Sequence, residues 1–534
     1  MGSLNAEYNE LIAAGEDLRK VNTPYGWSGP AAAAASTKGN QLIDGLEEWA
    51  AEIAAARRAA GDVADAITGL LNGVHEAEEL ARVHHFVIGD DGAIIDQGPP
   101  PDVPPEQQEA VANERRAISA ELAERVGQVL RTAEDIDNDF CVVLDRILSG
   151  HTIDAGANDN QSTSLAAAGN AGAAMGSLSI PAPPPPDATA AQNAAWWATL
   201  SGAQRTTLAN DRPELVGPRD GVSSVHRDIA NRHLLDKEQS TWATKRANIL
   251  QGIEAAEKGI IDPTDASRLR EELALVDSKI AALDSLENRL NQAPDTPEDQ
   301  KYYLLDISAS DDGRVIVAHG NPDTADNVAT FVPGTGSNLN NFESNLDRAD
   351  DMHRAAVRAD DGVSHSVIAW MDYDAPNTIP EAGLASYAED AREPIDRFQD
   401  GLRESHEGEP SHNTIIGHSY GSTAVGFAAR DEHLAVDDFI AVGSPGVGVD
   451  EVSQLHMSPD RVWAISAEND PVSGVVADTG RYGTSPSDPA FGANKIHSSP
   501  GSSWPLGAAH SQYWDRQNPA LWDMGKVIAG QRPG

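Results

Sequence analysis

A serine between two glycines is the residue best placed to do chemistry in this sequence. Residues 417–421 read Gly-His-Ser-Tyr-Gly and follow the apolar run Thr414–Ile416 directly, and a helical pattern begins at Thr423. A strand, a glycine-flanked turn and a helix together lift a serine hydroxyl above a sheet edge, close to the free amides of the helix N-terminus. The pattern predicts that Ser419 is a nucleophile. A plain Gly-Ser loop between a strand and a helix is the alternative.

A serine hydroxyl needs a base, and the base needs a carboxylate that orients it. When the serine follows a strand in this way, the acid and then the histidine come later in the chain. Asp470 follows the apolar run Val462–Ala467 and is the predicted acid, with Glu468 and Asp478 as rivals.

The predicted base is His510, which lies among small residues close to the C-terminus. The alternative is His497, whereas His418, next to the nucleophile, is expected to pack or to shape the turn. In this arrangement His510 takes the proton of Ser419, the serine attacks a carbonyl carbon, and water later releases the acyl group. This chemistry requires no metal and no organic cofactor, so none is expected.

The oxyanion that forms during such an attack needs backbone amides to stabilise it. The Tyr420 amide is one expected donor because it follows the nucleophile. Thr335 is the other, in the glycine-rich loop Phe331–Asn338. A simple turn is the alternative for this loop. A phosphate-binding loop is disfavoured because no Gly-Lys-Ser or Gly-Lys-Thr follows it.

Short apolar runs that could position these residues recur through residues 301–534. They are Tyr302–Ile307, Val315–His319, Ala329–Val332, Ser366–Met371, Thr414–Ile416, Phe439–Val442 and Val462–Ala467. The first two are expected to pair as an antiparallel hairpin. The later runs are about 20–40 residues apart, which is typical of β-α-β crossovers, and they are apolar throughout, as strands covered on both faces are. The sequence therefore predicts a mainly parallel sheet flanked by helices, in a catalytic domain at 301–534.

Three segments of different composition precede this domain. Residues 1–150 have apolar positions at helical spacing and are predicted to form an all-α bundle, interrupted by a small hairpin at the Asp-Gly turn of residues 91–92. Residues 151–187 are rich in Gly, Ala and Pro and are interpreted as a linker. Residues 188–300 form the third segment.

The segment 188–300 contains two long apolar-periodic stretches, at about 234–258 and 263–291. The second has apolar residues at alternating three- and four-residue spacing, as in a coiled coil. An antiparallel helical hairpin is the simplest prediction, and it could cap the site.

Composition and charge limit the possible partners. The chain has 83 acidic and 39 basic residues and a formal net charge of −44, so binding to nucleic acid is disfavoured. Its single cysteine, Cys141, excludes an internal disulfide and has apolar neighbours, so a buried structural thiol is expected. No Sec-type signal peptide is visible, and no apolar run approaches the roughly 20 residues of a membrane span. The expectation is a protein that is cytoplasmic or is exported without a cleaved signal, with no integral membrane segment.

Near the N-terminus, Trp27-Ser28-Gly29 lies between two helical patterns. It resembles the Trp-x-Gly helical hairpins that type VII secretion exports. That resemblance implies contacts with a helical partner or with secretion machinery. The alternative is an ordinary bend between helices in which Trp27 packs in a core.

From Trp196 to Gly534 the chain resembles an actinobacterial family of predicted α/β hydrolases that is related in pattern to cutinases. The matching segments are Trp196–Arg232, Phe331–Gly336, the Ser419 turn, Gly443–Gly446 and the region around His510. The resemblance implies an α/β-hydrolase fold and a Ser-His-Asp triad. Cutinases usually carry disulfides, so a chain with one cysteine departs from the true cutinase pattern.

The leading hypothesis is a lipase-like carboxylic-ester hydrolase that acts on small-molecule or lipid-like acyl esters. Two alternatives remain open. One is an amidase or peptidase with the same triad, and the other is a secreted helical interaction protein whose hydrolase domain is an inert scaffold.

Overall fold

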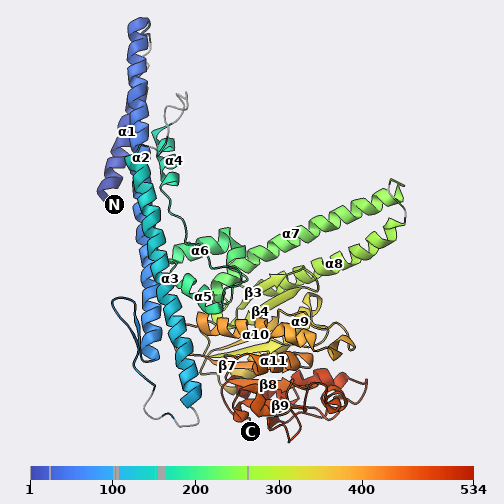
Figure 1. Cartoon of the computed structure of the whole chain (residues 1–534). Coiled ribbons are helices and arrows are strands. Elements are labelled where there is room, and N and C mark those ends of the chain that lie inside the picture. The colour runs from blue at the N-terminus through green and yellow to red at the C-terminus, as the bar shows by residue number, and fades with distance from the viewer. Residues whose placement is uncertain are drawn as a thin grey trace. The chain divides into compact units, whose positions relative to one another are not determined.

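The computed structural model describes residues 2–22, 26–99, 103, 108–150, 152–153, 164–260, 262 and 264–533 (Figure 1). The chain divides into two compact units. The first comprises Met1–Pro185 and Ala195–Arg205, and the second comprises Pro186–Ala194 and Thr206–Gly534. None of the helices in the described ranges is both long and apolar enough to cross a membrane.

The first unit is built on long helices. They are α1 (Gly2–Val21), α2 (Pro30–Val83), α3 (Gln108–Leu148) and α4 (Leu165–Met175). Strands β1 (Phe86–Ile88) and β2 (Ile94–Asp96) form the antiparallel hairpin expected at the Asp-Gly turn. The bend at Trp27-Ser28-Gly29 separates α1 from α2, and Pro30 occupies the first turn of α2, where its missing N–H is not needed.

Helix α4 lies inside the segment that was interpreted as a linker. A Cβ added to Gly172 would lie 2.2 Å from the Ala51 carbonyl oxygen of α2, and one on Gly176 would lie 2.3 Å from that of Ala55. Only glycine lets the two backbones approach so closely. The Gly/Ala composition therefore packs a helix here instead of leaving a solvated chain.

One expectation and one alternative for the first unit were wrong. Cys141 is exposed, whereas Val143 on the same helix is buried. Residues two apart on an α-helix point about 200° apart, so an apolar neighbour in sequence does not imply burial. Trp27 is also exposed and does not pack in a core.

The second unit contains an eight-stranded sheet. Its strands are β3 (Tyr302–Ser308), β4 (Arg314–His319), β5 (Asn327–Val332), β6 (His365–Met371), β7 (His412–His418), β8 (Asp438–Val442), β9 (Val462–Ile465) and β10 (Asn494–Ile496). Their order is β10-β9-β8-β7-β5-β6-β4-β3. All neighbours pair in parallel except β4, which is antiparallel to both β3 and β6. The predicted mainly parallel sheet and its antiparallel first hairpin are confirmed.

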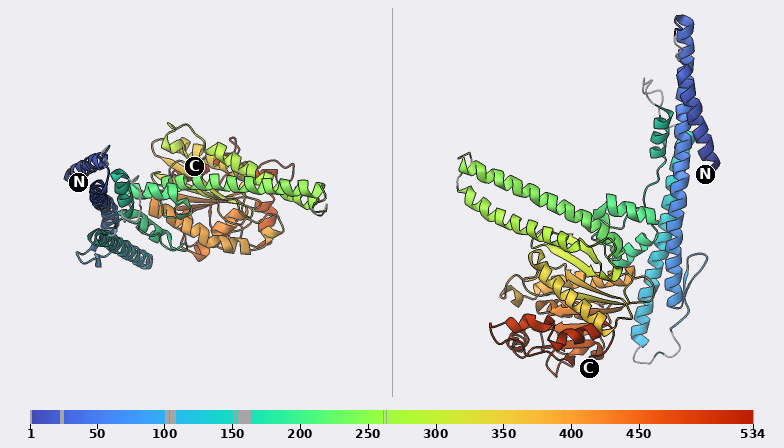
Figure 2. Two further views of the ribbon diagram at one scale, coloured as in Figure 1. Left: turned by 90° about the horizontal axis from the view of Figure 1, so that it is seen from above. Right: turned by 180° about the vertical axis from the view of Figure 1, so that it is seen from behind.

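Helices cover both faces of this sheet (Figure 2). Helices α9 (Phe342–Ala359) and α12 (Pro519–Ile528) pack in one core, and α10 (Ser386–Ser405) and α11 (Tyr420–Asp431) pack in the other. Successive residues of a strand point to opposite faces, so Phe331 of β5 lies in the first core and Val332 in the second. Burial on both faces explains why these strands are apolar throughout.

The predicted helical hairpin is formed by α7 (Ser224–Glu257) and α8 (Asp265–Leu290), and it projects beyond the sheet in Figure 1. Helix α7 begins ten residues before the predicted start. Its first turns carry buried polar residues, which hid the helical periodicity: Arg227 and Asn231 donate to the backbone carbonyls of Leu305 and Leu304 in β3, each at 3.1 Å. Two shorter helices precede it, α5 (Ala190–Ala198) and α6 (Gly202–Asp211).

Candidate active site

Ser419 lies in the sharp turn between β7 and α11. Its backbone has φ 53° and ψ −129°, a conformation that costs free energy for a residue other than glycine. Its N–H donates to the Val442 carbonyl at 2.9 Å, and its own carbonyl accepts from the Ser422 N–H at 3.0 Å. The turn is therefore held by the neighbouring strand β8 on one side and by the first turn of α11 on the other.

The two flanking glycines are required by close backbone packing. A Cβ on Gly417 would lie 2.4 Å from the Ser422 Cα, and one on Gly421 would lie 2.2 Å from the Val332 carbonyl oxygen. Neither contact can be relieved by moving a flexible side chain. The sequence Gly-x-Ser-x-Gly here is thus a steric requirement of the turn.

The predicted acid and base are in contact. The His510 Nδ1 lies 2.9 Å from Oδ2 and 3.0 Å from Oδ1 of Asp470. Asp470 is buried, and His510 is partly exposed. An Nδ1–H that donates to a carboxylate leaves Nε2 free to accept a proton, which is the tautomer a general base needs.

Two further donors contact Asp470. The Tyr513 hydroxyl donates to Oδ2 at 2.6 Å, and the Val472 N–H donates to Oδ1 at 2.8 Å. Burial alone would raise the pKa of Asp470, but the hydrogen bonds from His510, Tyr513 and Val472 hold that pKa below its ordinary value. The carboxylate consequently stays ionised at neutral pH.

His418 connects the turn to the base. Its Nε2–H donates to the His510 carbonyl at 2.9 Å, and the centroids of the two rings are 4.6 Å apart. Burial lowers the pKa of His418 well below its ordinary value, so this imidazole is neutral. His418 therefore packs against His510 and holds the proposed base next to the turn that contains Ser419.

The two expected oxyanion donors lie at the same turn. Tyr420 is the first residue of α11, where amides have no partner within the helix. A Cβ on Gly334 would lie 2.9 Å from the Tyr420 nitrogen and 2.8 Å from the Ser419 Cβ. The loop after β5, with half-buried Thr335 next in the chain, thus runs directly over the turn.

The rival candidates are placed differently. Glu468 and His497 are exposed. The side chain of Asp478 lies outside the described part of the chain. Ser419, Asp470 and the Thr335 loop each follow the carboxyl end of a parallel strand, so they share one edge of the sheet, the edge where α/β folds bind ligands.

Sequence reasoning missed Tyr513 in this region, and it named Gly443 only within the matching segment Gly443–Gly446 without giving it a role. His510 and Tyr513 are three apart in a 3-10 helix (Ala508–Trp514), where that spacing places side chains on one face. Gly443 has φ 55°, and a Cβ there would lie 3.0 Å from Oδ2 of Asp470 and 3.1 Å from Nδ1 of His510. The three-residue spacing was a usable signal for Tyr513, whereas the closeness of Gly443 to Asp470 and His510 could not be read from its local sequence.

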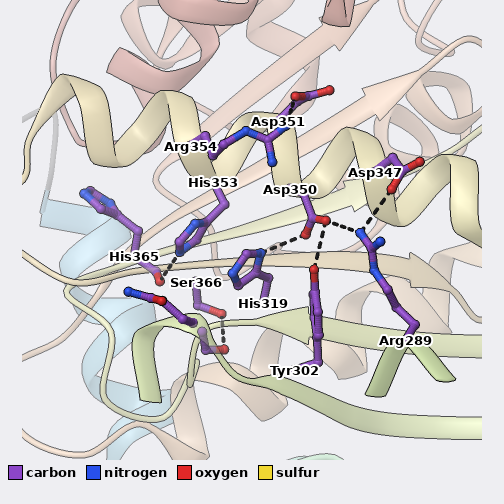
Figure 3. Close-up of polar contacts among 12 residues, drawn as sticks. Arg289, Tyr302, His319, Asp347, Asp350, Asp351, His353, Arg354, His365 and Ser366 are labelled. Atoms are coloured by element: carbon purple, nitrogen blue, oxygen red, sulfur yellow. Dashed lines mark hydrogen bonds and ion pairs between the residues drawn. The ribbon is translucent and has the colours of Figure 1, made fainter. Parts of the chain in front are cut away.

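Figure 3 shows a second histidine–aspartate cluster, formed by His319 and Asp350. His319 ends β4, which runs antiparallel to β6, so it lies where β6 begins. Asp350 of α9 accepts from His319 Nδ1 at 2.7 Å and from the Tyr302 hydroxyl at 2.9 Å, and it pairs with Arg289 of α8.

This second cluster resembles the first in its Asp-His-Tyr contacts but differs in what surrounds the histidine. The His319 ring stacks on His353 with centroids 4.0 Å apart, and the His353 Nε2–H donates to the His365 carbonyl at 3.2 Å. Burial and the neighbouring His319 lower the pKa of His353 to about 3. These contacts join α8, β3, β4 and α9, which is a structural role.

The chain is similar to several known proteins. The family model described as alpha/beta hydrolase matches residues 309–480. The uncharacterized protein Rv2079 of Mycobacterium tuberculosis is 28% identical over 365 residues. The match covers 63% of this chain and 55% of that protein, so this chain spans about half the length of that relative. A solved arylesterase structure is 13% identical, covers 53% of this chain and 96% of that chain, and has a TM-score of 0.27.

A shorter relative is matched over most of its length. The uncharacterized protein Mb0988c of Mycobacterium bovis is 30% identical over 221 residues, which cover 39% of this chain and 80% of that protein. The matching family model agrees with the mainly parallel, helix-covered sheet of the second unit. The chain belongs to an α/β-hydrolase family that has mycobacterial members.

Proposed function

We propose that this protein is a serine hydrolase that cleaves carboxylic esters through an acyl-enzyme intermediate. Ser419 is the nucleophile, His510 the general base and Asp470 the carboxylate that orients the base. The observation that carries the proposal is the pair of contacts from His510 Nδ1 to a buried Asp470, beside a strained turn that presents Ser419. The family membership supports hydrolysis in general.

The reaction begins when His510 Nε2 accepts the proton of the Ser419 hydroxyl as Oγ attacks the ester carbonyl carbon. The negative charge that develops on the carbonyl oxygen is stabilised by the backbone amides of Tyr420 and Thr335. The imidazolium then returns the proton to the leaving alcohol. Water, deprotonated by the same histidine, attacks the acyl-enzyme and releases the carboxylic acid.

Asp470 supports this cycle by its charge. A buried carboxylate that remains ionised stabilises the imidazolium that forms in each half-reaction. The hydrogen bonds that keep the pKa of Asp470 low also fix the plane of the carboxylate, and with it the His510 ring.

A Ser419→Ala variant tests the proposal. Hydrolysis of p-nitrophenyl esters by the full chain is expected to fall by at least about 10⁴-fold, because the nucleophile is lost while the fold is kept. A fluorophosphonate probe is expected to label the wild type at Ser419 and not the variant. A suitable control is Ser344→Ala, which removes an exposed hydroxyl on α9 and should retain both signals.

Other outcomes would point to the alternatives. Unlabelled wild-type protein, or a variant as active as the wild type, would contradict the triad and favour an inert scaffold. Faster turnover of a matched amide than of the corresponding ester would make the enzyme an amidase with the same residues.

A further inference from the structure

Two loops next to the proposed triad expose large apolar side chains to solvent. Val475 is 74% exposed and follows Asp470 by five residues. Trp504 and Leu506 are 80% and 79% exposed and precede His510 by six and four residues. We call Val475, Trp504 and Leu506, with the partly exposed Val476, the apolar rim. Large exposed apolar side chains close to a reaction site are suited to contact an apolar ligand or surface.

Both loops are fixed at their bases. The Asn469 N–H donates to the Pro500 carbonyl at 2.9 Å, and the Asn469 side chain donates to the Gly501 carbonyl at 2.9 Å. These bonds hold the segment before His510 against the residue next to Asp470. The Ser502 N–H in turn donates to the Gln512 side chain at 2.7 Å. The rim residues therefore belong to two loops whose bases are hydrogen-bonded to each other, next in the chain to the proposed acid and base.

The charge of the two loops differs from that of the rest of the chain. Residues 471–477 and 498–509 contain no Asp, Glu, Lys, Arg or His, in a chain whose formal net charge is −44. The exposed Glu468 lies beside the first loop. An apolar rim with no basic residue, on a strongly acidic protein, suits an uncharged surface and disfavours an anionic one.

We infer that the apolar rim docks the enzyme onto the uncharged surface of an aggregated, long-chain ester. This inference rests on the proposed ester hydrolysis and adds a substrate class, namely acyl esters presented at a lipid–water interface. The Trp504 indole and the Leu506 side chain enter the apolar layer, and Val475 and Val476 contact it from the other loop. The triad then meets the ester bond at the surface where such a bond lies.

Binding and kinetics of one double variant test the inference. Trp504→Ser combined with Leu506→Ser removes the two most exposed side chains of the rim. Its affinity for phosphatidylcholine vesicles is expected to fall about a hundredfold, since each of the two large side chains contributes roughly a tenfold factor when it leaves water. The KM for emulsified p-nitrophenyl palmitate should rise by a similar factor. Hydrolysis of soluble p-nitrophenyl acetate should fall much less.

A matched control comes from the tip and flank of the α7–α8 hairpin. Ile260 and Leu275 are 72% and 70% exposed, so Ile260→Ser with Leu275→Ser removes similar apolar area elsewhere. This variant should bind vesicles and hydrolyse palmitate as the wild type does. An equal loss in both double variants would overturn the inference, as would unchanged vesicle binding and palmitate KM in the rim variant.

Two further outcomes separate the claims. Binding of the wild type to phosphatidylglycerol vesicles as tight as to phosphatidylcholine would contradict an uncharged surface as the occupant. Failure of the wild type to hydrolyse any ester would refute the proposed function. If the wild type hydrolyses no ester but still binds vesicles through the apolar rim, the rim is a docking surface on a protein that is not an esterase. If it neither hydrolyses esters nor binds vesicles, both the proposed function and the docking inference are refuted.

Discussion

At the residue scale, the charge of the proposed triad is kept in place by the number of hydrogen bonds that the Asp470 carboxylate accepts. Asp470 is buried, and an uncompensated charge there would be costly. His510, Tyr513 and the Val472 N–H each contact it, and the Tyr513 hydroxyl also accepts the Ala467 N–H at 3.1 Å. Tyr513 therefore ties the acid to the end of β9. Because its hydroxyl and His510 share Oδ2, its loss affects the histidine as well as the acid.

Tyr513→Phe is expected to reduce kcat/KM for a soluble ester by on the order of tenfold. A hydrogen bond to a charged group contributes about 1.5–3 kcal/mol, and part of that free energy is lost to the transition state when the carboxylate can tilt. The measurement is steady-state kinetics at neutral pH. The control is Tyr482→Phe, which removes a hydroxyl that donates to the Ala382 carbonyl at 2.7 Å. Equal losses in the two variants would show a general packing effect instead of a role in orienting Asp470.

The residues proposed for catalysis could be chosen from the sequence because each follows a local pattern. Ser419 is set in a strand-turn-helix, and Asp470 comes just after an apolar run. The roles of Tyr513 and Gly443 were missed because they depend on contacts between segments far apart in the chain. The three-residue spacing from His510 indicates that Tyr513 shares its helix face, but the contact with a carboxylate 43 residues earlier cannot be read from that spacing.

At the scale of elements, burial on both faces made most of the sheet predictable. Seven strands from β3 to β9 coincide with the apolar runs, within a few residues at each end. Strand β10 (Asn494–Ile496) was missed because it has three residues and contains Lys495. Helix α4 was missed because its close packing uses glycine and alanine, which hydrophobic periodicity does not register. Helix–helix contacts made by small residues need three-dimensional information.

The packing of α9 on β4 and β6 has a consequence for stability against acid. His353 has a pKa of about 3 in the folded protein, below the 6.5 of an unperturbed histidine. Between these values the unfolded chain binds a proton that the folded one excludes. The free energy of unfolding therefore falls as the pH drops below about 6.5, by up to about 1.4 kcal/mol per pH unit for this one group.

His353→Phe removes the titrating ring from this site and keeps an aromatic group to stack on His319. The variant is expected to be less stable at neutral pH, because the hydrogen bond to the His365 carbonyl is lost. The fall of its unfolding free energy between pH 7 and pH 5 should be shallower than in the wild type. Urea unfolding followed by tryptophan fluorescence measures both. Exposed His497→Gln is the control, and a slope identical in His353→Phe and wild type would contradict the buried neutral histidine.

At the scale of the whole molecule, the proposed chemistry belongs to one of the two units. Ser419, Asp470, His510 and the Thr335 loop all lie in the unit formed by Pro186–Ala194 and Thr206–Gly534. The first unit also includes the short stretch Ala195–Arg205, which follows the first segment of the second unit. The chain therefore passes between the units more than once. A single cut in the sequence therefore cannot divide the chain into these two units.

Removing residues 1–185 tests this division. We expect the truncated chain to have the same kcat/KM for a soluble ester as the full chain, because every residue of the proposed triad remains. The value is normalised to the fraction of Ser419 that a fluorophosphonate labels. Trp196 and Trp197 are buried in the full chain, and the Trp196 Nε1–H donates to the Pro181 carbonyl at 3.1 Å. The deletion removes that acceptor and uncovers two indoles, each with about 150–250 Å² of surface.

The truncated chain is therefore expected to self-associate in sedimentation velocity while its labelled fraction stays active. Trp196→Ser with Trp197→Ser in the same truncated chain should reduce the association, because apolar area drives it. A large fall in kcat/KM per labelled serine would instead mean that residues 1–185 contribute directly to the reaction. If kcat/KM is unchanged and the truncated chain sediments as a monomer, the two indoles are shielded from solvent by other residues of the truncated chain.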